Sequence, residues 1–356
     1  MHGTAIVLTQ GLLHTPSAKT AHGLIRGSER FHVQAVIDSV SAGKDAGAVL
    51  DGKNRGIPVF ASVAEYLQSQ PSPVAEFSIL GVAHAGGSIA PEWMSSIRES
   101  IAANMSVVSG MHQFLSETPE MVSLAEKHGV QLIDVRKPKP REELHFWSGE
   151  IHNVTCGKIA VLGTDCAVGK RTTARFLVQA SREAGLKSEM IYTGQTGWMQ
   201  GGKYGFVFDT TVNDFVSGEI EHAIVTCFRE ENPDVVFIEG QAALRNPSGP
   251  CGSEFLVSGM SDGVVLVHPP GRIFYKGWEK TGRKIFPLST EIDLMKMYGV
   301  PTLGIALNTQ GLTLAQAKDW QARYEDELAL PVVLPVEEGV EGLIPAIKQK
   351  ISDIKA

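Results

Sequence analysis

Short apolar runs alternate with amphipathic stretches through the first part of the chain. The pattern predicts strands at residues 4–9, 32–38, 57–59, 77–82, 105–109 and 131–135. Between them, residues 17–27, 62–69, 91–103 and 118–128 have the pattern of helices. Strands that alternate with helices are typical of a parallel, doubly wound sheet. We therefore expect an α/β domain here.

A second α/β pattern follows in the rest of the chain. It predicts strands at residues 158–162, 187–192, 234–241, 263–267 and 301–307, and helices at residues 171–184, 211–229, 313–327 and 340–354. Between the two patterns, residues 136–141 read Arg-Lys-Pro-Lys-Pro-Arg. Alternating prolines hold such a segment extended, and its charges keep it solvated. We therefore predict two domains, residues 1–141 and residues 142–356.

The strand at residues 158–162 leads into a glycine-bounded loop, because residues 163–173 read Gly-Thr-Asp-Cys-Ala-Val-Gly-Lys-Arg-Thr-Thr. In a P-loop, backbone N–H groups, a helix N-terminus and a lysine converge on a phosphate. The usual motif has four residues between its glycines and a hydroxyl residue after the lysine. Here five residues separate Gly163 from Gly169, and Arg171 follows Lys170. We therefore expect phosphate binding without nucleotide hydrolysis. The candidate binding residues are Gly163, Thr164, Val168, Gly169, Lys170, Arg171, Thr172 and Thr173.

Composition narrows the classes of function. The 356 residues are 43% hydrophobic and 20% charged, which indicates a packed globular protein, and the net charge is −7. An acidic chain is a poor general nucleic-acid binder, since phosphate contacts need a basic face. The four cysteines show no metal-binding spacing, no apolar run approaches the length of a membrane span, and the N-terminus lacks the basic region of a signal peptide. We expect a cytoplasmic protein with free thiols, no bound metal and no membrane contact.

The first turn of the N-terminal domain, residues 10–16, lacks the Gly-x-Gly-x-x-Gly fingerprint of dinucleotide-binding proteins. Asp38 stands where a ribose-binding acid would, but a capping or solvated role suits it better. Two other segments are candidates for function. Lys19 and Arg26 lie two helical turns apart on one face, and residues 83–88 follow a strand, where ligands gather in open α/β sheets. A solvated surface is an equal alternative for the basic pair.

Two acids are candidates for catalysis. Glu239 ends an apolar strand, as a Walker B acid does, and burying a carboxylate costs several kcal/mol without a partner. A functional role is therefore favoured, with pKa tuning as its use. Asp165 lies inside the phosphate loop. Hydrogen bonds to the amides of that loop are at least as good an interpretation for it.

A basic loop follows the strand at residues 263–267. It contains Arg272, Lys276, Lys280, Arg283 and Lys284 among aromatic residues and glycines. Such a loop on an acidic chain indicates recognition of carboxylates or phosphates, although a solvated loop has the same composition. Arg245 follows the Glu239 strand and is expected near the same cleft. We take Arg245, Arg272, Lys276 and Arg283 as substrate-binding candidates. His268, at a strand end, suits either proton transfer or a plain hydrogen bond.

Two resemblances bear on function. The loop at residues 163–170 resembles the Gly-Thr-Asp-Thr-x-x-Gly-Lys-Thr loop of dethiobiotin synthetases, and Glu239-Gly240 resembles their Val-Glu-Gly-Ala-Gly-Gly strand end. A closer match covers nearly the whole chain. Residues 19–23 (Lys-Thr-Ala-His-Gly), the phosphate loop, residues 193–197 (Thr-Gly-Gln-Thr-Gly) and residues 238–241 (Ile-Glu-Gly-Gln) together resemble the DgcN-type D-glutamate N-acetyltransferases.

The second resemblance implies a Rossmann-like N-terminal domain, a P-loop C-terminal domain and acetyl transfer from acetyl-CoA to the amine of D-glutamate. The phosphates of coenzyme A would then occupy the loop. Glu239 becomes the candidate base, and the basic loop with Arg245 the candidate site for the carboxylates. We also expect a homo-oligomer. The alternatives are an ATP-dependent ligase or kinase of the dethiobiotin synthetase type and a nucleotide-binding regulator without turnover.

Overall fold

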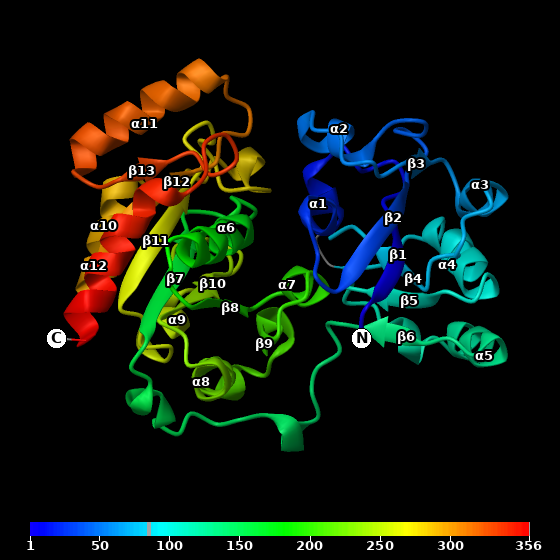
Figure 1. Ribbon diagram of the computed structural model, residues 1–356, viewed down its shortest axis with the longest axis horizontal. Helices are drawn as coiled ribbons and strands as arrows, with labels where there is room; N and C mark the ends of the chain where they lie inside the picture. The colour runs from blue at the N-terminus through cyan, green and yellow to red at the C-terminus, as the bar shows by residue number, and fades with distance from the viewer. Residues whose placement is uncertain (84–86, 356) are drawn as a thin grey trace. The chain divides into compact units, whose positions relative to one another are not determined.

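The computed structural model of the protein describes residues 1–83 and 87–355, and the chain divides into two compact units. The N-terminal unit consists of Met1–Pro138 and Gln195–Gly201, and the C-terminal unit of Lys139–Gly194 and Gly202–Ala356. Both are built on parallel sheets, so the predicted α/β class is confirmed (Figure 1). None of the described helices is long and apolar enough to cross a membrane.

The N-terminal unit has a sheet of six strands in the order β3-β2-β1-β4-β5-β6. The change of direction lies between β1 and β4, which is the arrangement of a Rossmann-like sheet. Its strands are β1 (Gly3–Leu8), β2 (Phe31–Ile37), β3 (Val59–Phe60), β4 (Phe77–Leu80), β5 (Ser106–Ser109) and β6 (Leu132–Asp134). Its helices are α1 (Lys19–Arg26), α2 (Ala46–Asp51), α3 (Val63–Gln68), α4 (Trp93–Ala102), α5 (Pro119–His128) and α7 (Gln195–Met199).

The C-terminal unit has a sheet of seven strands in the order β13-β12-β11-β7-β10-β8-β9. Its strands are β7 (Gly157–Gly163), β8 (Ser188–Tyr192), β9 (Tyr204–Gly205), β10 (Val235–Glu239), β11 (Gly263–His268), β12 (Thr302–Leu307) and β13 (Val332–Val333). Its helices are α6 (Lys170–Glu183), α8 (Asn213–Glu231), α9 (Ser253–Val257), α10 (Leu288–Met297), α11 (Leu314–Leu328) and α12 (Ile344–Lys355). The strands β8, β9 and β10 lie to one side of β7 in the strand order, and β11, β12 and β13 lie to the other side. The strand order therefore reverses at β7, and the phosphate loop follows the strand at this switch point.

The two faces of this second sheet are both buried, which explains why its strands are continuous apolar runs. In β7, Ala160 and Leu162 face a core that includes α8, α10 and α11, whereas Ile159 and Val161 face a core that includes α6 and α12. The central strand β7 is thus held rigidly between β10 and β11. A loop that leaves such a strand has a fixed origin.

Candidate functional site

The phosphate loop joins β7 to α6, and its two glycines are needed for different reasons. Gly169 has φ +101°, in the left-handed region that side chains disfavour, and Ala167 is also left-handed with φ +52°. At Gly163, a Cβ atom would lie 2.8 Å from Cγ2 of the buried Val168, closer than such atoms approach. The loop therefore folds back onto the end of its own strand.

Side chains from the ends of neighbouring strands hold this loop in place. The Thr164 hydroxyl lies 2.9 Å from Nδ1 of His268, and Nε2 of His268 lies 3.2 Å from the hydroxyl of Tyr324. Asn308, which follows β12, donates from Nδ2 to the carbonyl of Val168 at 2.9 Å. Burial, assisted by the charge of Arg272, lowers the pKa of His268 to about 4. His268 is therefore neutral at pH 7 and serves as a hydrogen-bonded support.

Asp165 is fully buried and connects the phosphate loop to two other segments. One of its carboxylate oxygens accepts from the Cys166 amide at 2.7 Å and from Asn246 Nδ2 at 2.9 Å. The other accepts from Arg272 Nη1 at 2.7 Å and from the Lys276 amide at 2.9 Å. Both oxygens are engaged by donors, so this geometry favours the supporting role over proton transfer for Asp165.

Lys170 begins α6, and its ammonium is buried at the base of the loop. It donates to the carbonyl of Asp165 at 2.8 Å and to the carbonyl of Ala242 at 2.7 Å. Burial lowers the pKa of Lys170, and four nearby side chains oppose the shift: Cys166, Cys251, Asp165 and Glu239. An ammonium has three N–H donors. Two therefore orient Lys170, and the third has no acceptor among the residues that the structure describes, so it can serve a ligand oxygen.

The rest of the predicted phosphate-binding set lies in the first turn of α6. Arg171 and Thr172 are half-buried, and Thr173 is buried with its amide donating to the Gly169 carbonyl at 2.9 Å. The structure therefore gathers all eight predicted residues in one loop and one helical turn. The hydroxyl that normally follows the lysine of a P-loop is absent at position 171, as the sequence indicates.

Glu239 ends β10 and is 6% exposed. Its Oε2 atom accepts from the amide of Thr193 at 3.0 Å, while the Thr193 hydroxyl donates to the Glu239 carbonyl at 2.6 Å. Gln241 in turn donates to that hydroxyl at 2.8 Å. Because Glu239 opposes the pKa shift of Lys170, its carboxylate lies within electrostatic reach of the phosphate loop.

The four predicted substrate-binding cations separate into two pairs. Arg272 and the backbone of Lys276 are attached to Asp165 in the phosphate loop. The guanidinium groups of Arg245 and Arg283 instead lie over the ring of Phe286, at 3.9 and 5.9 Å from its centroid. The described contacts therefore attach one pair to the phosphate loop and the other pair to Phe286, while Tyr275, next to Lys276, bonds through its amide to the Arg283 carbonyl.

Arg245 is also committed to a buried acid. Its Nε atom donates to Glu291 at 2.9 Å, and its Nη2 atom donates to the Thr290 hydroxyl at 2.6 Å. Burial raises the pKa of Glu291, although Arg245 opposes the shift. Part of the hydrogen-bonding capacity of Arg245 is therefore used within the protein.

Four residues that hold the loop or Glu239 have no role assigned from the sequence: Asn246, Asn308, Thr193 and Gln241. Asn246 and Asn308 stand in no motif, whereas Thr193 and Gln241 belong to the motifs at residues 193–197 and 238–241. One signal was available for three of them. Thr193, Gln241 and Asn308 are polar residues within two positions of the end of a buried strand, where the carboxyl ends of parallel strands gather.

In the N-terminal unit, Asp38 is fully buried and stabilises loops. It accepts from the Thr9 hydroxyl at 2.8 Å, the Leu13 amide at 2.9 Å and the Ser41 amide at 2.9 Å. Despite burial, which acts in the opposite direction, these hydrogen bonds lower the pKa of Asp38. This geometry supports the capping interpretation over a ribose-binding role.

The other N-terminal candidates give little support for a site. Arg26 lies 3.5 Å from Asp51 in an ion pair, and the segment at residues 83–88 includes residues 84–86, which lie outside the described chain.

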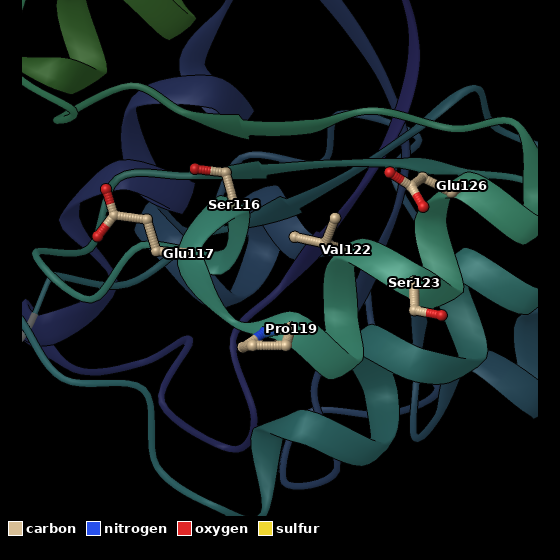
Figure 2. A pocket seen from close by; sticks show the side chains of 6 residues that line it. All are labelled: Ser116, Glu117, Pro119, Val122, Ser123 and Glu126. Atoms are coloured by element: carbon tan, nitrogen blue, oxygen red, sulfur yellow. The ribbon is translucent and has the colours of Figure 1, made fainter.

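A cavity of about 330 Å³ lies beside α5, with Glu117 and Glu126 at its two ends (Figure 2). Its lining also includes Ser116, Pro119, Val122 and Ser123, and the ammonium of Lys137 lies 3.3 Å from Glu117 in an ion pair.

Comparison with known proteins adds independent findings. A P-loop domain of unknown function, DUF1611_C, matches residues 145–344, and a Rossmann-like domain, DUF1611_N, matches residues 39–138. A D-glutamate N-acetyltransferase of Pseudoalteromonas sp is 30% identical over 275 residues, which are 76% of this chain and 80% of that protein. Another, of Tritonibacter scottomollicae, is 28% identical over 292 residues, or 79% and 84%. A crystal structure of a DUF1611 family protein from Anabaena variabilis superposes with a TM-score of 0.87 at 30% identity, and the match covers 98% of this chain and 100% of that one.

Proposed function

The chain belongs to the DUF1611 family, and on this basis we propose that it is an N-acetyltransferase, which moves the acetyl group of acetyl-CoA to the amine of D-glutamate. The observation that carries the proposal is similarity to two D-glutamate N-acetyltransferases along most of the chain. It is supported by a pre-formed anion-binding loop that lacks the hydroxyl used by P-loop enzymes to hold magnesium.

In this proposal the loop binds the pyrophosphate of coenzyme A. Backbone amides of residues 167–170 at the N-terminus of α6 and the remaining N–H of Lys170 supply the donors. The supports from His268, Asn308 and Asp165 fix the loop before the ligand arrives. Binding therefore costs little reorganisation, and no phosphate bond is broken.

Acetyl transfer then requires removal of a proton from the ammonium of the acceptor. The amine nitrogen attacks the thioester carbonyl, an oxyanion forms, and the C–S bond breaks as coenzyme A leaves as a thiolate that takes up a proton. We assign the role of base to Glu239, whose carboxylate is buried and held by the Thr193 amide. The chemistry calls for N–H donors at the oxyanion and for cations at the two carboxylates of glutamate.

We assign the acceptor carboxylates to Arg245 and Arg283, whose guanidinium groups both lie over the ring of Phe286. Arg283 is exposed, and Arg245 is held in place by Glu291. A guanidinium fixed in this way can bind a carboxylate through two parallel N–H bonds. Replacing Arg283 by Ala should raise the KM for D-glutamate and leave coenzyme A binding nearly unchanged.

One observation favours a second candidate, an ATP-dependent ligase or kinase of the dethiobiotin synthetase type. Glu239 ends the strand beside β7 and acts electrostatically on Lys170, which is the position of a Walker B acid. In such an enzyme the acid would hold magnesium rather than accept a proton. A regulator that binds a nucleotide without turnover is a third possibility with the same loop.

A single assay separates these functions. The protein is incubated with acetyl-CoA and D-glutamate in the presence of a metal chelator and without ATP, and release of the coenzyme A thiol is followed. Acetyl transfer predicts thiol and N-acetyl-D-glutamate under these conditions, and a much slower reaction with L-glutamate. A ligase or kinase stays silent until ATP and magnesium are added and then releases ADP. Silence in both arms, with ligand binding retained, would identify a regulator.

A further inference from the structure

The segment that carries Arg272 and Lys276 is attached to the phosphate loop. Arg272 donates to the Asp165 carboxylate at 2.7 Å and to the Cys166 carbonyl at 2.8 Å, and the Lys276 amide donates to the same carboxylate at 2.9 Å. Between these two residues, the buried Tyr275 anchors the segment, with its amide bonded to the Arg283 carbonyl at 3.0 Å. The ammonium of Lys276 therefore extends from a backbone fixed beside the loop.

The ammonium of Lys276 has no hydrogen-bond or ion-pair partner in the part of the chain that the structure describes. Arg272 takes up one oxygen of Asp165, and the backbone amide of Lys276, rather than its ammonium, donates to the same oxygen. Although Lys276 as a whole residue is exposed, partial desolvation of its ammonium and the like charge of Arg272 lower its pKa. Two like charges on one segment repel each other, and an anion bound beside both would offset that cost. The free ammonium beside the phosphate loop is therefore a suitable partner for an anion.

Coenzyme A supplies a second anion at a fixed separation from the first. Its 3′-phosphate is a monoester that carries close to two negative charges at pH 7. It sits on the same ribose whose 5′ oxygen carries the pyrophosphate, so a pyrophosphate in the loop necessarily brings the 3′-phosphate close by. Acetate, glutamate and 3′-dephospho-coenzyme A lack this 3′-phosphate.

We propose that Lys276 binds the 3′-phosphate of coenzyme A, and that Arg272, fixed on Asp165, positions the segment that presents it. The assignment rests on the proposed function, because it takes coenzyme A as the ligand of the loop. It moves Lys276 from the acceptor, where the sequence placed it, to the donor. It also makes the 3′-phosphate the feature by which this site distinguishes coenzyme A from ADP and ATP, which have a 5′-diphosphate or 5′-triphosphate but no 3′-phosphate.

The test compares coenzyme A with 3′-dephospho-coenzyme A by titration calorimetry, in the native chain and in Lys276→Gln. The native chain should bind coenzyme A about tenfold or more tightly than the dephospho form. Lys276→Gln should lose about tenfold for coenzyme A and almost nothing for the dephospho form, so that the preference disappears. Lys296→Gln is the matched control, since it removes one exposed positive charge from the last turn of α10 and should keep the full preference.

Three results would overturn the assignment, and each is recognisable. Equal weakening of both ligands by Lys276→Gln would show that Lys276 does not read the 3′-phosphate. A raised KM for D-glutamate with the preference intact would return Lys276 to the acceptor. If the native chain binds ATP but does not bind coenzyme A, the proposed function itself is refuted. A melting temperature equal to that of the native chain shows that Lys276→Gln, at an exposed position, is folded.

Discussion

The buried imidazole of His268 should make the free energy of unfolding depend on pH. The imidazole is 6% exposed, lies 2.9 Å from the Thr164 hydroxyl, and has its pKa lowered to about 4 by burial and by Arg272. In the unfolded chain a histidine has a pKa near 6.5. The unfolded state therefore binds a proton at higher pH than the folded state does. The stability that His268 contributes is complete above about pH 7 and is lost as the pH falls toward 4. By pH 5 the loss from this one group is about 2 kcal/mol, and at its limit about 3 kcal/mol.

The assay is urea unfolding between pH 7.5 and pH 5, followed by tryptophan fluorescence. Trp320 is a suitable probe, because it stacks on Tyr324 at 5.3 Å and Tyr324 contacts His268. His268→Asn keeps a polar atom near Thr164 but does not titrate, so its free energy of unfolding should fall about 2 kcal/mol less than that of the native chain over this range. His32→Asn, at an exposed position of β2, controls for loss of a histidine and should follow the native chain. Parallel pH profiles for the native chain and His268→Asn would refute the reasoning.

Three substitutions test the site further. Lys170→Ala removes a charge-assisted contact of roughly 1.5–3 kcal/mol, so coenzyme A affinity measured by calorimetry should fall about tenfold or more. Unchanged affinity for both coenzyme A and ATP would contradict a phosphate-binding loop. Asp165→Asn leaves Arg272 without its ion-pair partner, so the free energy of unfolding of the C-terminal unit, measured in urea, should fall by about 3 kcal/mol. Loss of turnover with an unchanged free energy of unfolding would favour a catalytic role for Asp165. Glu239→Gln should lower kcat about a hundredfold or more at constant KM for acetyl-CoA if Glu239 is the base, and a kcat close to native would exclude it.

Most strands of the two sheets could be predicted from the sequence, because they are largely buried and mostly apolar. The two-residue strands β9 and β13 could not, and neither could the segment after β8. That segment has glycines at positions 194, 197, 201, 202 and 205 and no helical pattern, yet Gln195–Met199 forms α7 and belongs to the N-terminal unit. There, Gln195 accepts from Arg136 at 2.9 Å and the Thr196 hydroxyl lies 3.0 Å from that of Thr20. A helix of five residues leaves no periodic signal, and its position is decided by partners far away in the sequence.

The chemistry of the site was predictable by residue type but not by pairing. The phosphate loop, Glu239 and the basic loop all follow strand ends, as the sequence indicates. The sequence does not show that Arg272 pairs with Asp165, which is 107 positions away, or that Arg245 pairs with Glu291, which is 46 positions away. These pairings decide which cations have capacity left for a ligand. Charge composition therefore locates a binding loop, and only the fold distinguishes its supports from its contacts.

The position of Glu239 restricts how coenzyme A can lie. Glu239 ends β10, which pairs with the strand that leads into the phosphate loop, and its charge acts on Lys170, so we expect its carboxylate nearer the phosphates of the ligand than the thioester. The pantetheine arm separates the pyrophosphate from the thioester by about 14 Å when extended, the length of four extended residues. A base must come within about 3 Å of the proton it removes. Glu239 can therefore be the base only when the arm turns back across the end of β10. If Glu239→Gln instead tightens coenzyme A binding and leaves kcat nearly unchanged, the removed charge faced the phosphates, the arm is extended, and the base lies at its far end.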